Sequence, residues 1–211
     1  MSANEHIFYF VRYPLGGGGT HLSNLISLSE NINKKIENVS ATDYFLYLKD
    51  IYTNNEKHLH DDQQFIISDI DQWKSKLLKT NYKLSGSVYT GHAASFTWAK
   101  SIIDHLRIKK YISITFDSEE SEKILSDREY KLFDTHTLRN SYYKEEMRFF
   151  YNQEFISDSI LCNDDINLKF EITDIFSKNI SPVIKKINQK YNIGIPEDQA
   201  QALHNLWIKK I

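Results

Sequence analysis

The feature that most constrains the fold is residues 7–28, where an apolar strand-type run meets four consecutive glycines and then a helix-type run. Residues 7–11, IFYFV, are β-branched or aromatic, which is typical of a strand that is covered on both faces of a parallel sheet. Beyond the glycines, apolar side chains recur at helical spacing: Leu22, Leu25, Ile26 and Leu28. The order of elements is therefore strand, glycine loop, helix, and we expect this strand to lie in the middle of a domain.

The glycine loop comprises four of the seven glycines in the chain: Gly16, Gly17, Gly18 and Gly19. Without Cβ atoms, successive N–H groups can converge, and the free N–H groups at the start of the following helix add to them. This arrangement predicts a seat for an anion, most often a phosphate. A strand-to-helix turn with no ligand is the alternative interpretation. The Walker A pattern is not met, because Gly19 is followed by Thr20 and His21 and the lysine is absent, which disfavours an ordinary ATPase or kinase.

Length and composition narrow the class of protein. The 211 residues fit one domain, and we expect a single domain over 1–211. A net charge of −2 offers no field to recruit nucleic acid or an anionic membrane. Cys162 is the only cysteine, which excludes an internal disulfide and a thiolate metal cluster. With no signal pattern and no apolar run of membrane-spanning length, we expect a soluble, cytoplasmic protein.

Residues 41–80 contain two amphipathic stretches separated by a polar one. Spacing predicts amphipathic helices over 41–52 and 65–78, and we expect region 41–80 to be a helical insertion. A polar stretch between these helices carries His58, His60, Asp61 and Asp62. A solvated loop is favoured there over a metal site, because no further ligands follow at suitable spacing. The sequence therefore predicts no metal centre.

His92 is the candidate catalytic residue. Residues 88–90 read as a short buried strand, so Gly91 and His92 fall at its carboxyl end, the edge at which ligands bind in open α/β sheets. A histidine there can act as a general base, because its ordinary pKa lies near neutrality. A histidine that only makes a hydrogen bond in a loop is the alternative, and the sequence leaves both open.

The remaining elements complete an alternating pattern. The sequence predicts strands over 111–116 and 167–172, a helix over 119–132 capped by Asp117 and Ser118, and a helix over 137–153. The next predicted helix carries apolar residues on one face: Ile180, Val183, Ile184, Ile187 and Tyr191. A turn at Asn192, Ile193 and Gly194 ends it, and a last helix begins at Pro196 and carries Ala200, Leu203 and Trp207. Short strands separated by helices predict an α/β fold, a three-layer αβα arrangement around a mostly parallel sheet with right-handed crossovers.

In order and pattern, these segments resemble the sulfotransferase branch of the P-loop nucleoside-triphosphate-hydrolase-like fold. The stretch from Gly17 to Leu22, GGGTHL, corresponds to the SGTTWL of that family, and the closing residues 168–210 resemble the usual ending of the family. The resemblance implies that the loop, with Thr20 and His21, holds the 5′-phosphosulfate of 3′-phosphoadenosine 5′-phosphosulfate. It also implies that His92 is the base that activates the acceptor hydroxyl. We then expect the helical insertion over 41–80 to act as a lid or to form the acceptor side of the site.

Two positions depart from the family pattern. Gly16 stands where the family has a lysine that contacts the transferring group, and Arg12 is the candidate to replace that lysine. The arginine that binds the 3′-phosphate is missing after the third core strand, where acidic residues follow instead. Arg139 with Ser141 is the candidate for this second role, although the pair falls later in the chain.

The expected function is sulfuryl transfer from a small-molecule nucleotide donor to a hydroxyl or amine of an unknown acceptor. A non-catalytic binding or interaction protein of the same fold is the main alternative, which the missing lysine and arginine favour. A small-molecule kinase is a third alternative, disfavoured by the absent Walker lysine. The sequence leaves the acceptor and the oligomeric state open.

Overall fold

A computed structural model describes residues 7–13, 17–34, 39–54, 86–92, 110–115, 118–121, 123, 124, 127 and 167–211. In chain order the elements are β1 (Ile7–Tyr13), α1 (Gly19–Ile26), α2 (Ala41–Asn54), β2 (Gly86–His92), β3 (Lys110–Thr115), β4 (Asn167–Glu171), α7 (Ile172–Phe176), α8 (Ser181–Tyr191) and α9 (Glu197–Ile208). Most of them lie within one or two residues of the predicted positions.

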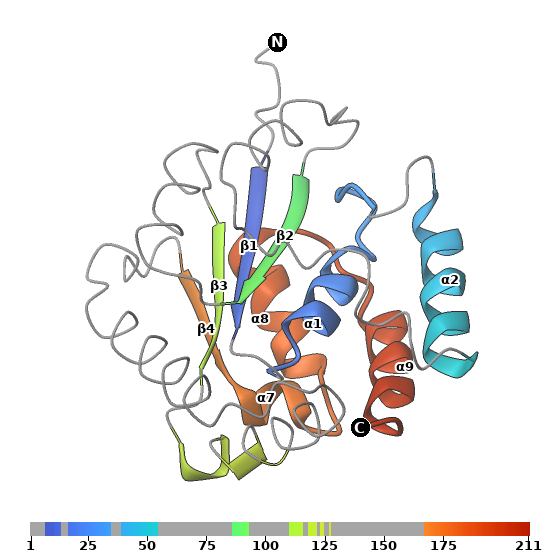
Figure 1. The fold of residues 1–211 in the computed structure, drawn as a ribbon. Coiled ribbons are helices and arrows are strands. Elements are labelled where there is room, and N and C mark those ends of the chain that lie inside the picture. Colours follow the sequence, from blue (N-terminus) through green and yellow to red (C-terminus); the bar gives the residue numbers. More distant parts are fainter. Residues whose placement is uncertain are drawn as a thin grey trace.

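The four strands form one parallel sheet in the order β2-β1-β3-β4, running downward in Figure 1. This confirms the α/β class and the parallel sheet. β1 is interior, as predicted, and alternate side chains are buried on both faces. Val11 and Tyr13 join the main core cluster, while Phe8 and Phe10, on the opposite face, are also buried.

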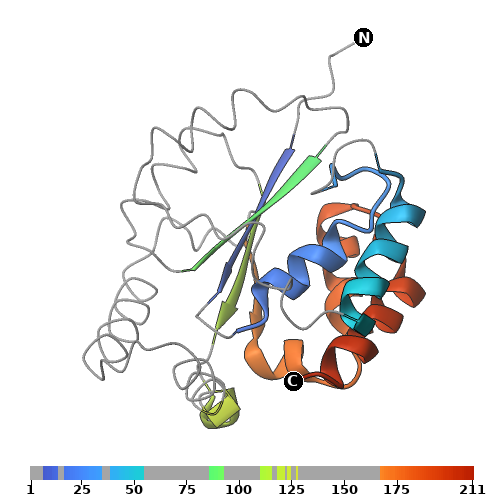
Figure 2. The same cartoon turned by 45° about the vertical axis from the view of Figure 1, so that its right-hand side comes forward.

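The described helices lie on one side of the sheet (Figure 2). α1 contacts β1 and β2, α8 contacts β4, and α9 contacts α1, α8 and α2. The apolar positions predicted for these helices are the buried ones: Tyr44, Leu48, Ile51 and Tyr52 on α2, Val183, Ile184, Ile187 and Tyr191 on α8, and Ala200, Leu203 and Trp207 on α9. Residues that would form a helical layer on the other face are outside the described ranges, so the third layer stays a prediction.

The end of β4 differs from the prediction. The strand stops at Glu171, and Ile172 begins the short helix α7 instead of closing the strand. A capping box explains the change, because the Glu171 side chain accepts from the Asp174 amide and the Asp174 carboxylate accepts from the Glu171 amide at 3.0 Å. Further on, Asn192 ends α8 in the left-handed conformation, with φ 52°, which confirms the predicted turn before α9.

Several predicted segments lie outside the described residues. They are the helices over 65–78 and 137–153, most of the expected lid in region 41–80, and the cluster from His58 to Asp62. Among the described helices, none combines the length and the apolar character that crossing a membrane requires.

Candidate functional site

The carboxyl ends of the strands form the candidate site. Tyr13, the last residue of β1, is paired in register with His92, the last residue of β2. From β1 the chain proceeds to β2 on one side, and later to β3 and β4 on the other. The order in which strands are added to the sheet therefore changes side between β1 and β3, which makes this a topological switch point. In open parallel sheets, ligands bind outside the carboxyl ends of the strands at such a point.

The glycine loop leads directly from β1 into α1 at this edge. Gly18 is the N-cap of α1, with φ 78°, and its carbonyl accepts the first intrahelical bond from Leu22 at 3.0 Å. The amides of Gly19, Thr20 and His21 precede that bond, so the helix itself offers them no acceptor. The first turn of α1 carries no acidic residue that would compete for these amides. The described residues thus include one part of the predicted anion seat, the free amides at the start of α1.

The glycines also have a packing reason. A Cβ atom on Gly18 would lie 2.9 Å from Ile175 Cγ2 and 3.2 Å from the Trp207 ring, and one on Gly19 would lie 2.0 Å from the ring of Tyr13. Side chains of α7 and α9 therefore pack directly against Gly18 of the glycine loop. Close packing alone requires glycine at these two positions, with or without a ligand.

The side chains that follow the loop are engaged within the protein. The hydroxyls of Thr20 and Tyr13 share a hydrogen bond of 2.8 Å. His21 is 3% exposed, and its Nδ1 lies 2.9 Å from the Tyr52 hydroxyl and its Nε2 lies 3.0 Å from His204 Nδ1. The His21 side chain thus faces the interior between α1, α2 and α9. Any contact of His21 with an anion at the edge must come from its backbone amide.

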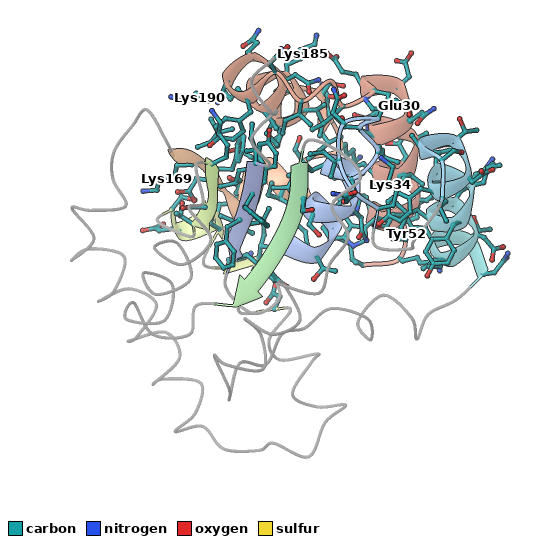
Figure 3. All side chains as sticks on the ribbon, turned by 90° about the horizontal axis from the view of Figure 1, so that it is seen from above. Glu30, Lys34, Tyr52, Lys169, Lys185 and Lys190 are labelled. Atoms are coloured by element: carbon teal, nitrogen blue, oxygen red, sulfur yellow. The ribbon has the colours of Figure 1, made fainter. Side chains whose placement is uncertain are left out.

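Further bonds extend this interior contact into a chain of groups, which we call the histidine chain: Asn24, Tyr52, His21, His204 and the carbonyl of Ser177. Asn24 Nδ2 donates to the Tyr52 hydroxyl at 3.1 Å, and His204 Nε2 lies 2.6 Å from the Ser177 carbonyl oxygen. Figure 3 shows Tyr52 on the side of α2 that faces α1. Burial raises the pKa of Tyr52, against the opposing effect of the Asn24 hydrogen bond, and keeps its hydroxyl protonated.

The β3–β4 side of the site has a different character. The Glu171 carboxylate accepts from the hydroxyls of Ser121 at 2.6 Å, Thr115 at 3.0 Å and Ser118 at 3.3 Å. Ser118 Oγ also accepts from the Ser121 amide at 3.2 Å, which confirms Ser118 as the cap of the helical segment that follows β3. The three hydroxyls on this side of the edge are therefore engaged by an internal carboxylate.

The predicted site residues are only partly brought together. Arg12 lies on β1 and His92 on β2, at the expected edge, although neither side chain is described. Gly17, Gly18, Gly19 and Thr20 join them there, while Gly16, Arg139 and Ser141 lie outside the described residues.

Sequence reasoning missed His204, Tyr52 and Glu171. The partner of His21 is 183 residues away in the chain, and no spacing rule connects two such positions. The one available signal was that His204 falls on the apolar stripe of α9, one turn before Trp207.

Comparisons with known proteins found no protein family and no curated protein that this chain significantly matches. In the described part of the chain, no group of three or more His, Cys, Asp or Glu residues is placed to hold a metal ion.

Proposed function

We propose that this chain binds the anionic sulfuryl- or phosphoryl-bearing end of a nucleotide donor at the carboxyl edge of the sheet and transfers a sulfuryl group to an acceptor hydroxyl or amine. The observation that carries the proposal is the register of β1 and β2, in which Tyr13 and His92 are paired at the edge from which α1 begins. A candidate base and a candidate anion seat therefore lie at neighbouring strand ends.

In this proposal the amides at the start of α1 hold the donor, and the partial positive charge of the helix terminus opposes the negative charge of the transferring group. His92 takes the proton of the acceptor as the new oxygen–sulfur or nitrogen–sulfur bond forms. The bond to the donor phosphate breaks, and the electron pair leaves with the nucleotide. Catalysis then rests on positioning and on charge stabilisation.

Replacing Thr20 by Asp tests the anion seat. An acidic residue in the first helical turn favours the helix but repels an anion, so Thr20→Asp should fold normally and bind the donor about 10- to 100-fold more weakly. Thr20→Asn has nearly the same shape without the charge and is the matched control, and it should retain most of the affinity. Calorimetric titration with adenosine 3′,5′-bisphosphate, adenosine 5′-phosphosulfate and ATP measures the effect. Equal affinities for the Asp and Asn variants would remove the anion seat from the start of α1.

Replacing His92 by Ala tests the base. Loss of a general base should lower the rate of sulfuryl transfer by at least about a hundredfold while donor affinity stays near that of the wild type. The measurement is radiolabelled sulfate transfer to a panel of phenols, alcohols and amines, with donor binding determined in parallel. Full turnover by His92→Ala would exclude this residue as the base.

A non-catalytic protein with the same fold is the second candidate. Two observations favour it. Packing against Tyr13, Ile175 and Trp207 is enough to require Gly18 and Gly19, and the hydroxyls on the β3–β4 side already donate to the Glu171 carboxylate instead of to a 3′-phosphate. If none of the three nucleotides binds and the Thr20 variants behave alike, this second function replaces the first.

A further inference from the structure

The histidine chain links four elements that are distant in sequence. His21 is the third residue of α1, Tyr52 lies near the end of α2, and His204 lies on α9. The last acceptor is the carbonyl of Ser177, the C-cap of α7. The chain therefore ties the start of α1 to α2, α9 and the end of α7 through consecutive hydrogen bonds.

The direction of these hydrogen bonds follows from their last acceptor. A carbonyl can only accept, so His204 Nε2 must carry a proton and donate to Ser177. In a neutral His204, Nδ1 is then an acceptor, and His21 Nε2 must donate to it. His21 Nδ1 is in turn an acceptor and receives the hydroxyl proton of Tyr52. With both imidazoles neutral, every bond of the histidine chain is satisfied.

The same groups hold the glycine loop. The ring of Trp207 is stacked on His21 with centroids 4.1 Å apart and an interplanar angle of 7°, and it lies so close to the loop that a Cβ on Gly18 would be 3.2 Å away. Ile175 and Phe176 of α7 reach Gly18 as well. Because His204 binds the end of α7 and His21 supports Trp207, the histidine chain keeps α7 and α9 against the loop.

The surroundings do not compensate an added positive charge. The buried titratable groups on the packed elements are Tyr44 and Tyr52 on α2 and His204 on α9. The carboxylates of these elements are exposed or half-buried: Asp43 and Asp50 on α2, Asp174 on α7, and Glu197 and Asp198 on α9. The nearby lysines are the exposed Lys49 and the half-buried Lys210, which donates to the Ile51 carbonyl at 3.4 Å. No carboxylate among the described residues contacts either imidazole. A proton on His21 would therefore be a buried, uncompensated charge.

We propose that the histidine chain is an acid-sensitive latch, which keeps α7 and α9 closed on the glycine loop at neutral pH and releases them when His21 or His204 takes up a proton. One added proton lets every hydrogen bond persist, because the Tyr52 hydroxyl can accept as well as donate, but it places an uncompensated charge in the interior. A second proton makes His21 Nε2 and His204 Nδ1 both donors, and the bond between the two imidazoles then has to break. Release of α9 withdraws Trp207 from Gly18 and loosens the loop.

The direction of the pH dependence follows from burial. Burial, with a smaller contribution from nearby His204, lowers the pKa of His21 well below its ordinary value, and burial lowers the pKa of His204 against the opposing effect of the Ser177 carbonyl. The open state therefore binds protons more readily than the closed state. The latch is fully closed above about pH 6.5, the ordinary histidine pKa, and weakens as the pH falls below it, at most about tenfold in the opening equilibrium per pH unit for each proton taken up.

The test uses the whole wild-type chain without any ligand. Proton–nitrogen correlation spectra of the imidazole rings at pH 7.5 should show His21 and His204 as neutral Nε2–H tautomers. Between pH 6.5 and 5, amide exchange corrected for its intrinsic pH dependence should accelerate together in residues 17–26, 177–180 and 197–208. Imidazoles that are charged at pH 7.5, or rings that titrate with no change in exchange, would overturn the latch.

Variants separate the latch from general acid sensitivity. His21→Gln/His204→Gln retains the Nε2–H donors but cannot titrate, and its amide exchange should lose most of the acid response. Tyr52→Phe is the matched control, because it removes one hydrogen bond and leaves both imidazoles, so its exchange should remain acid-sensitive. A double variant that responds to acid like the wild type would refute the latch. If that variant does not fold, the wild-type spectra still decide. None of these measurements depends on the proposed transfer activity.

Discussion

Gly18→Ala should lower the free energy of unfolding by about 2–5 kcal/mol. The left-handed conformation at φ 78° costs a residue with a Cβ about 1–2 kcal/mol. The new methyl group also lies 2.9 Å from Ile175 and 3.2 Å from Trp207, and overpacking of this kind costs about 1–3 kcal/mol. Urea unfolding followed by circular dichroism measures the sum.

Gly194→Ala is the control that isolates the conformational part. Gly194 also has a left-handed φ, 77°, but a Cβ there would meet nothing closer than Asn31 at 4.0 Å. Its replacement should therefore cost only about 1–2 kcal/mol. If Gly18→Ala and Gly194→Ala lower the free energy of unfolding equally, the close packing of α7 and α9 against Gly18 is contradicted.

Trp207→Ala should lower the free energy of unfolding by about 3–5 kcal/mol. Trp207 is 5% exposed, stacks on His21, lies 5.0 Å from the ring of Phe176 and fills the space against Gly18. Truncation removes these contacts and leaves a cavity at the junction of α1, α7 and α9. Leu206→Ala, next to it on α9 and only partly buried, is the matched control with the smaller expected loss.

The two substitutions should also be coupled. In a Trp207→Ala background one of the two nearest neighbours of the Gly18 methyl group is gone, so Gly18→Ala should cost at least about 0.5 kcal/mol less there than in the wild type. A double-mutant cycle from four urea titrations gives this number. If the two losses of unfolding free energy add exactly, the cost of Gly18→Ala comes from Ile175 or from the backbone conformation and not from Trp207.

Elements with local signals were predictable from the sequence. The strand-type run of β1, the glycine loop and the apolar spacing of α1 define three consecutive elements, and the structure has all three. The end of α8 was equally accessible, because Asn192 and Gly194 supply left-handed conformations and Pro196 precedes the next helix. These features depend on neighbouring residues, which a sequence displays directly.

The histidine chain and the hydrogen bonds of Glu171 to Thr115, Ser118 and Ser121 were not predictable, because the partners come from distant segments. Thr115 and Glu171 stand 56 positions apart, and Asn24 and Tyr52 stand 28 apart. The glycines illustrate the same limit. Their clustering suggested a ligand, whereas contacts with Tyr13, Ile175 and Trp207 supply an additional reason that only the folded chain reveals.

The central position of β1 has a consequence for synthesis on the ribosome. β1 is translated before its sheet partners, which come from residues 86–92 and 110–115, and His204, the partner of His21, lies 183 residues beyond His21. At about 5–20 residues per second, helix α1 waits on the order of 10–40 s for that partner. Nascent chains should therefore expose the apolar surface of β1 and α1 until the segments that cover it have been translated, and should depend on chaperones that recognise such segments.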